Sequence, residues 1–376
     1  MSEEIPLNTL LGLIRKESNP EVLQCAQRRQ VAIWEEREPD YLPLLVHGAV
    51  PERDDYPTYN LKEQFSNPEK MLYEQLWTAL GVLRSRADGV PSVRVNLGTG
   101  FLASVFGLEQ EVFPDKMPWL REHLSKEEIL RLMPQNLEPL FEKGLLPQCR
   151  RYIELYKEKL NRTPVSIFLP DTQGPFDLAH LLVGDIIFTE LYDDTDFINH
   201  LLMLSSYVYR KVTVLLKAWI GEPLNSGYHS YYLRMSGCGV RCCEDTTTLL
   251  SPELIHSILP FTQEAIAPFG GWVHFCGNRH HMLESILSLP EVKGINFGNP
   301  EMYDWETVFP EIIAMGKLYY GTVSRKEREP LSEYFQRVLS PLKRKGNLIL
   351  CLYLQEGETA QEALSLWHKV QDMHFP

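Results

Sequence analysis

Hydrophobic positions in the last third of the chain follow two alternating periods. Short apolar runs bounded by turn residues are typical of strands that are buried on both faces. Each run is followed by a segment with apolar residues at helical spacing. Such consecutive strand–helix units predict a parallel sheet with helices packed outside it. The four units are GGWVHFCG with RHHMLESILSLP, GINFG with DWETVFPEIIAMG, KLYYGTV with EPLSEYFQRVLSPLKRKG, and NLILCLYL with ETAQEALSLWHKVQDM.

The middle of the chain adds further elements. The alternating segment 92–98 and the apolar run 165–170 predict strands, and the segment 226–237 is expected to be extended. A long amphipathic helix is predicted over 194–221, with Asp194 or Thr195 as its N-cap and Gly221 at its end. A second helix is predicted over 251–270, because Ser251 can cap it and Pro252 suits its first position.

The first 90 residues differ from the rest in having broken helical patterns. Residues 60–86 show a helical period and end in the turn signal ADGVPS. Together with the earlier strands, eight strand–helix units fit the chain length. The sequence therefore predicts an α/β fold, a (β/α)8 TIM-type barrel over 91–376 with a helical N-terminal extension over 1–90. We expect 1–376 to form a single domain.

Composition narrows the class of protein. Among 376 residues, 37 are Lys or Arg and 50 are Asp or Glu, which gives a formal net charge of −13. Such an acidic surface repels phosphate backbones, so nucleic acid is not expected as the main partner. No apolar run approaches the roughly 20 residues of a spanning helix, so no membrane association is expected. The seven cysteines and the absence of an export signal predict a cytoplasmic protein.

Two predicted strand ends carry residues suited to metal binding. In an extended strand, His274 and Cys276 point to the same side, and imidazole and thiolate are natural zinc ligands. Cys351 lies in the last predicted strand. If the barrel closes, these three residues form a zinc site with one open position, which is typical of catalytic zinc. Equally, Cys351 suits a core position, since buried cysteine often acts as a small hydrophobe.

A second group of thiols competes for this role. Cys238, Cys242 and Cys243 lie in the Gly-rich segment SGCGVRCCED. Their CxxxCC spacing is not that of a zinc knuckle, and no second pair complements it. A structural role is the simpler interpretation, although one of these cysteines remains an alternative third ligand.

Other polar residues near predicted strand ends are candidates for substrate chemistry. Asp171 follows a predicted strand and suits a general base, a hydrogen-bond acceptor or a helix cap. Arg234 and Arg241 suit bidentate binding of a substrate carboxylate, or internal ion pairs with Glu244 or Asp245. The expected substrate contacts are Gln173, Phe176, Tyr228 and His280.

Several of these stretches resemble a known family. DTQGPFDLAHLLVG, LLSPELIHSILPFTQEAIAPFGGWVHFCGN, the GINFG strand and GNLILCLYLQEGETAQEAL are similar to the uroporphyrinogen decarboxylase superfamily. The chain looks most like the branch of zinc-dependent methylcobalamin:coenzyme M methyltransferases. The resemblance covers about the last 215 residues, and the first 150 match loosely.

The resemblance carries specific implications. The decarboxylases hold substrate carboxylates with an arginine-rich segment, where this chain has WEEREPDYLP, and they have Gly-His-Gly where this chain has Leu350-Cys351-Leu352. Uroporphyrinogen decarboxylation is therefore not expected. In the methyltransferases an HxC pair and a cysteine of the last strand bind zinc. His274 and Cys276 match that pair, whereas Cys351 matches by position without the surrounding Pro-Gly-Cys-Gly pattern.

The resulting functional hypothesis is zinc-dependent methyl transfer between a corrinoid protein and a small thiol or methylated substrate. The chain lacks a DxHxxG corrinoid motif, so cobalamin is expected on a separate corrinoid protein. Two alternatives remain open: a metal-independent decarboxylase or other lyase, with Asp171 and Arg234 as polar anchors, and a non-catalytic barrel that binds a tetrapyrrole or a partner. A homo-oligomer is compatible with each hypothesis.

Overall fold

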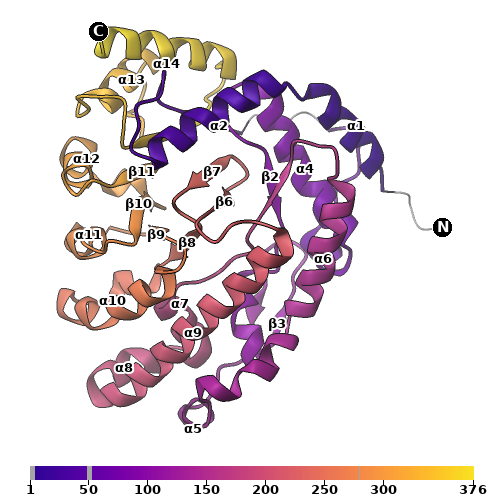
Figure 1. Cartoon of the computed structure of the whole chain (residues 1–376), viewed down its shortest axis with the longest axis vertical. Helices are drawn as coiled ribbons and strands as arrows, with labels where there is room; N and C mark the ends of the chain where they lie inside the picture. Colours follow the sequence, from indigo (N-terminus) through magenta and orange to yellow (C-terminus); the bar gives the residue numbers. More distant parts are fainter. Residues whose placement is uncertain (1–4, 49–52, 279) are drawn as a thin grey trace.

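The computed structural model describes residues 5–48, 53–278 and 280–376. Its main sheet contains six parallel strands in the order β1-β12-β11-β10-β9-β8 (Figure 1). The last four strands in the chain are those that the sequence predicts, and they lie side by side in chain order. The bounds are β1 Leu44–His47, β8 Val240–Cys243, β9 Gly271–Phe275, β10 Val292–Phe297, β11 Leu318–Gly321 and β12 Leu348–Tyr353.

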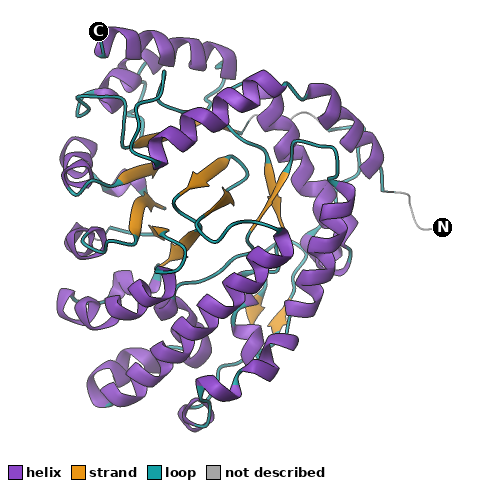
Figure 2. Ribbon diagram, in the orientation of Figure 1, coloured by secondary structure: helices purple, strands orange, loops and turns teal. Residues whose placement is uncertain are grey.

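A second parallel pair extends this arrangement. Strand β2 (Ser92–Arg94) pairs with β5 (Ser166–Phe168). A parallel bridge between Gln173 and Cys243 then brings the chain that follows β5 against β8. Figure 2 shows the strands inside and most helices outside. This arrangement is compatible with the predicted TIM-type fold.

The helices surround the strands on their outer side. Asp194 caps α9 by accepting a hydrogen bond from the Phe197 amide, and Gly221 ends it in a left-handed conformation. Ser251 caps α10, as predicted. The bounds are α1 Leu7–Glu17, α2 Pro20–Trp34, α3 Leu61–Ser66, α4 Pro68–Ser85, α5 Lys126–Leu130, α6 Leu146–Lys159, α7 Pro175–Val183, α8 Ile186–Asp193, α9 Thr195–Ile220, α10 Pro252–Ile266, α11 His280–Leu287, α12 Trp305–Ala314, α13 Leu331–Leu339 and α14 Ala360–His374.

The N-terminal segment departs from the predicted helical extension. Residues 1–90 do contain helices, but β1 lies among them and pairs with β12 through Leu44 to His47. Leu44, Leu45 and Val46 are buried. A four-residue apolar run shows no period of its own, so only its pairing with β12 identifies it as a strand.

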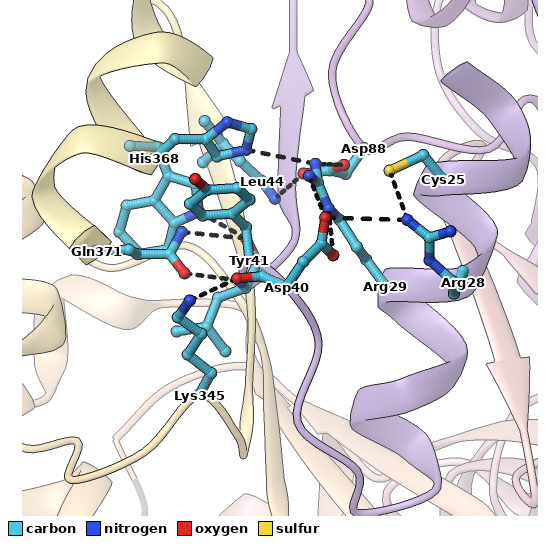
Figure 3. A network of polar contacts seen from close by, with 12 residues as sticks. Cys25, Arg28, Arg29, Asp40, Tyr41, Leu44, Asp88, Lys345, His368 and Gln371 are labelled. Carbon is cyan, nitrogen blue, oxygen red and sulfur yellow. Dashed lines mark hydrogen bonds and ion pairs between the residues drawn. The ribbon is translucent and has the colours of Figure 1, made fainter. Parts of the chain in front are cut away.

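A network of polar contacts anchors the start of β1 (Figure 3). Arg29 on α2 contacts Asp88 and Asp40, each at 2.8 Å. The other Asp88 oxygen accepts a hydrogen bond from the Leu44 amide at 3.0 Å. The hydrogen bond from Arg29 lowers the pKa of Asp40 to about 2. These contacts of Arg29 and Asp88 hold the start of β1 in place.

The C-terminal helix completes this anchor. The Trp367 indole of α14 donates to the Leu42 carbonyl at 2.7 Å, and the Leu42 amide donates to Gln371 at 2.7 Å. His368 of the same helix stacks on Tyr41, with ring centroids 3.9 Å apart. Both ends of the chain thus fix the strand that the sequence did not reveal.

An antiparallel hairpin, β6 (Ser226–His229) and β7 (Leu233–Ser236), forms the predicted extended segment. Its turn residues Ser230 and Tyr231 both have positive φ, 51° and 68°. The Val90 and Ser92 amides, at the start of β2, donate to carbonyls of the turn region. The hairpin therefore lies against the N-terminal end of β2, while its turn side chains line the cavity described below.

None of the described helices is long and apolar enough to cross a membrane.

Candidate active site

A cavity of about 450 Å³ lies at the carboxyl ends of the parallel strands. This is the end at which enzymes of parallel α/β folds place their chemistry. Residues of the β6–β7 turn form part of its lining. The lining residues are His47, Arg94, Phe168, His229, Ser230, Tyr231, Tyr232, Arg241, Trp272, His274, Asn296, Phe297, Gly298, Tyr320, Gly321, Thr322, Cys351 and Tyr353.

His274 is oriented by its neighbour on β10. Its Nδ1 lies 2.6 Å from Asn296 Oδ1, and Asn296 Nδ2 donates to the Tyr320 carbonyl at 2.6 Å. Because Asn296 uses its amide on that carbonyl, its oxygen accepts the Nδ1 proton of His274. Burial lowers the pKa of His274, which favours the neutral ring. The lone pair of Nε2 is therefore free for a ligand.

Three potential metal ligands converge at this imidazole. Ligand atoms of Cys243, Asp245 and His274 all lie within 4.8 Å of one another. The predicted ligand Cys276 does not belong to this group of three, but its Sγ lies beside it, 3.7 Å from His274 Nε2. Cys243 and Asp245 come from β8 and the residues after it, whereas His274 and Cys276 come from β9 and the residue after it. We call these four residues the metal cluster.

The backbone around Asp245 is fixed by a buried carboxylate. Asp177 on α7 accepts hydrogen bonds from the amides of Asp245 and Thr246, at 2.9 and 2.7 Å. Asp245 itself accepts a hydrogen bond from the Cys276 amide at 2.6 Å. Burial raises the pKa of Asp177. These contacts connect the two strand ends that carry the metal cluster.

The residue types of the metal cluster are natural zinc ligands, and two of its donor separations are close to those of a zinc site. A tetrahedral ion with bonds of about 2.0–2.3 Å places neighbouring donors roughly 3.4–3.8 Å apart. The 3.7 Å between His274 and Cys276 falls in this range, and Asp245 Oδ1 lies 3.9 Å from His274 Nε2. Gly298 leaves room beside the donors, since a Cβ there would lie 2.5 Å from Cys276 Sγ.

The thiols of the metal cluster are protonated in the free protein. Burial raises the pKa of Cys276 to about 11 and raises that of Cys243 well above its usual value. A bound cation reverses this preference, because thiolates rather than thiols coordinate metals. Metal binding at this position therefore releases protons.

Cys351, the third ligand expected from the sequence, lies on β12 and lines the same cavity. Strands β10 and β11 separate it from β9. It does not belong to the group of three converging ligands, whereas Cys243 does. Burial raises the pKa of the Cys351 thiol to about 12. Its role as a ligand stays a prediction.

Asp171 pairs with two arginines that line the cavity, but neither Asp171 nor Gln173 is itself a lining residue. Arg241 pairs with one of its oxygens, and Arg94 lies 3.7 Å from the other. Gln173 Nε2 also donates to Asp171 at 3.0 Å. Although burial opposes it, Arg241 and Arg94 hold the pKa of Asp171 below its usual value. Asp171 is therefore an anion engaged by Arg241.

The remaining predicted contacts lie outside the lining residues. Phe176 is buried on α7 and packs edge-on against Phe188. The Arg234 guanidinium donates to the carbonyls of Gly227 and Met235 and lies over the Tyr228 ring. His280 pairs with Glu311 at 3.2 Å. In this structure these side chains contact other elements of the fold.

Sequence reasoning missed several residues of the cavity. Arg94, His47 and Asn296 each lie in or at the end of a short strand, where a polar residue can face either side. Arg94 lay inside the predicted strand 92–98, and only the structure shows that the strand ends at this residue. His47 belongs to the strand that had no recognisable pattern. Asn296 was hidden in GINFG because its partner His274 is distant in sequence.

Comparison with known proteins identifies the fold. No family model and no curated protein sequence matches the chain. Among solved structures, a methyltransferase from Methanosarcina mazei is similar, with a TM-score of 0.62 and 15% sequence identity. The match covers 93% of this chain and 98% of that one. The two chains therefore share a fold over nearly their whole length.

Proposed function

We propose that this protein is a zinc-dependent methyltransferase of the uroporphyrinogen decarboxylase superfamily. It would transfer a methyl group between a separate corrinoid protein and a small thiol or methylated substrate. The convergence of imidazole, carboxylate and two thiols at the strand ends is the observation that carries this proposal. The name of the similar structure, a methyltransferase, supports the same class of reaction.

In this proposal three donors of the metal cluster hold zinc, the fourth coordination position takes the substrate, and the cavity holds the rest of the substrate. Bound zinc would supply a positive charge that lowers the pKa of a substrate thiol. Asn296 keeps Nε2 of His274 directed at the ligand position. The aromatic lining excludes water from the reacting group, which strengthens electrostatic interactions there.

The wider proposal concerns the setting of the site. The strands would close into a (β/α)8 barrel whose mouth admits the cobalamin of the corrinoid partner. The protein would act in the cytoplasm, where its seven free cysteines remain reduced.

Metal analysis of variants tests this proposal. The purified protein, reloaded with zinc, should retain one ion per chain after gel filtration. His274→Ala and Cys243→Ser should lose it while their circular dichroism stays unchanged. Cys25→Ser, on the outer helix α2, is the matched thiol control and should retain zinc.

Cys351→Ser separates the two possible ligand sets. Unchanged zinc affinity would assign the position of the third ligand, beside His274 and Cys276, to Cys243, whereas a loss as large as that of Cys276→Ser would assign it to Cys351. A wild-type protein that cannot be loaded with zinc would refute the proposal. It would favour the metal-independent lyase instead, for which the buried Asp171 with its arginines supplies the polar groups.

A further inference from the structure

Arg94 is the least satisfied charged side chain of the cavity. It ends β2, and its side chain is 17% exposed. Its Nε is buried without a hydrogen-bond partner. Its one ion pair, with Asp171, is 3.7 Å long, which is too long for a hydrogen bond. This guanidinium donates no hydrogen bond to any residue that the structure describes.

Arg94 and Arg241 compete for the Asp171 carboxylate. Arg241 already takes one of its oxygens at close range, and the Asp245 carboxylate also stabilises the charge of Arg241. His229 and His274, which also face the group, are kept neutral by burial. Arg94 is therefore left with only a long contact to a carboxylate that Arg241 already engages. A buried cation without hydrogen bonds is costly, and a second anion would remove that cost.

Much of the remaining cavity lining is aromatic. Aromatic side chains from several strands and from the β6–β7 turn line it beside Arg94. The Phe168 ring lies 5.9 Å from the Arg94 guanidinium carbon and close to the ring of Tyr231. Such walls favour stacked or edge-on contact with another planar group. The aromatic lining consists of Phe168, Tyr231, Tyr232, Trp272, Phe297, Tyr320 and Tyr353.

We propose that the cavity binds a planar organic acid whose carboxylate accepts hydrogen bonds from Arg94. The acid group completes the shell of this guanidinium, and the flat body of the ligand lies between the aromatic walls. Arg241 stays paired with Asp171 and adds positive charge to the pocket. This inference rests on the proposed function only for the thiol or methyl group that the acid would present to the metal cluster.

Calorimetric binding of three simple probes tests the inference on the full-length, zinc-loaded protein. Benzoate carries both features, benzamide is its uncharged counterpart, and acetate lacks the planar body. Benzoate should bind at least about ten-fold more tightly than either of the others, as expected for a desolvated guanidinium–carboxylate pair. Arg94→Gln should reduce benzoate affinity to the level of benzamide without changing benzamide binding.

Controls keep the result interpretable. Arg84→Gln removes an arginine that is 41% exposed on α4 and should leave all three affinities unchanged. If Arg94→Gln does not fold, Arg94→Lys retains the charge without the planar fork and should show an intermediate loss for benzoate. Equal binding of benzoate and benzamide, or of benzoate and acetate, overturns the inference. Benzoate affinity unaffected by either Arg94 variant overturns it as well.

His274→Ala separates this inference from the proposed function. Benzoate selectivity should persist in that variant, because Arg94 and the aromatic walls do not depend on zinc. If the wild-type protein cannot be loaded with zinc but still binds benzoate selectively, only the metal-dependent reaction is refuted. If the wild-type protein binds zinc but does not prefer benzoate to benzamide and acetate, only the inference of a planar acid ligand is refuted.

Discussion

Arg29 and Arg94 show how differently the two ends of the parallel sheet are built. Arg29, at the amino ends of the strands, has 2.8 Å contacts with both Asp40 and Asp88 (Figure 3). Arg94, at the carboxyl end of β2, has one ion pair of 3.7 Å and an unpartnered Nε. Both guanidinium groups are largely shielded from water. The first is satisfied within the protein, whereas the second awaits a ligand.

Residues that stabilise the fold thus lie at the amino ends of the strands, whereas the candidate functional residues lie at the carboxyl ends. At the amino ends, side chains of α2, α14 and the loops fix β1 by hydrogen bonds to its backbone and flanking residues. At the carboxyl ends, His47 Nε2 and Arg94 Nε are buried without partners, and three potential metal ligands converge with Cys276 beside them. Unpaired polar groups cost free energy, so the amino end supplies the stability that permits them.

The largest expected effect comes from breaking the amino-end network. Asp88→Ala leaves the buried Nη1 of Arg29 without its carboxylate and the Leu44 amide without its acceptor, although Asp40 still pairs with Arg29. The free energy of unfolding should therefore fall by about 3–5 kcal/mol. Urea unfolding measures this change. Glu17→Gln, which removes the partner of two partly exposed arginines, should cost less than about 1 kcal/mol. Equal losses for the two variants would contradict the contrast.

Acid should weaken the two ends in a similar way. Burial lowers the pKa of His47 and of His368 to about 4, below the usual value of 6.5. A depressed histidine pKa means that the folded state favours the neutral ring. The stabilising contribution is therefore complete above pH 6.5 and is lost as the pH falls through 4.

For His47 this contribution amounts to about 3 kcal/mol. His47→Phe should flatten the dependence of the unfolding free energy on pH between 6.5 and 4. His180→Phe serves as a matched control, because His180 is partly exposed and pairs with the exposed Asp185. An unchanged slope in His47→Phe would show that burial of this ring does not control the acid sensitivity.

A smaller effect is expected when the support of the metal cluster is removed. Asp177→Ala deletes the acceptor of the Asp245 and Thr246 amides, so zinc affinity should fall by about 10–100-fold, as is typical of residues that orient ligands. Competition with a chromophoric chelator measures this affinity. Asp177→Asn retains an acceptor oxygen and should restore part of it.

Asp185→Ala, which changes a 94% exposed carboxylate, is the control for that measurement. A loss of unfolding free energy in Asp177→Ala with full zinc affinity would make Asp177 purely structural.

The smallest effect on stability is expected at Arg94 itself. Arg94→Gln removes a buried charge that has no hydrogen bond, so the free energy of unfolding should change by less than about 0.5 kcal/mol or increase. Arg29→Gln, measured in the same urea series, should lose several kcal/mol. If both substitutions destabilise the protein equally, Arg94 serves the fold rather than a ligand.

The sequence predicted the regular part of this fold well. The bounds of β9 to β12 and of the helices after them follow from apolar runs, helical spacing and turn residues that are local in the chain. The caps of α9 and α10 were likewise readable, because a side chain caps its own helix. β1 escaped notice, since its identity depends on β12, some 300 residues away.

The candidate site was only partly predictable for the same reason. His274 and Cys276 share one strand end, and their proximity follows from the period of an extended chain. Cys243 and Asp245 join them because β8 pairs with β9 in a register that places Cys243 opposite His274. Nothing in the CxxxCC spacing indicates that register. The sequence therefore favoured Cys351, which the structure places on β12, three strands from β9 along the sheet.

By itself, the sequence determined which segments become strands and helices, and it placed an imidazole and a thiol at one strand end, because local periodicity and capping depend on neighbouring residues. Tertiary structure decided which distant residues meet: Asp245 with His274, Arg94 with Asp171, and Arg29 with Asp88. These contacts depend on strand register and on the packing of elements that are far apart in the chain. The free energy of a buried charge in turn depends on the partners that this packing brings to it.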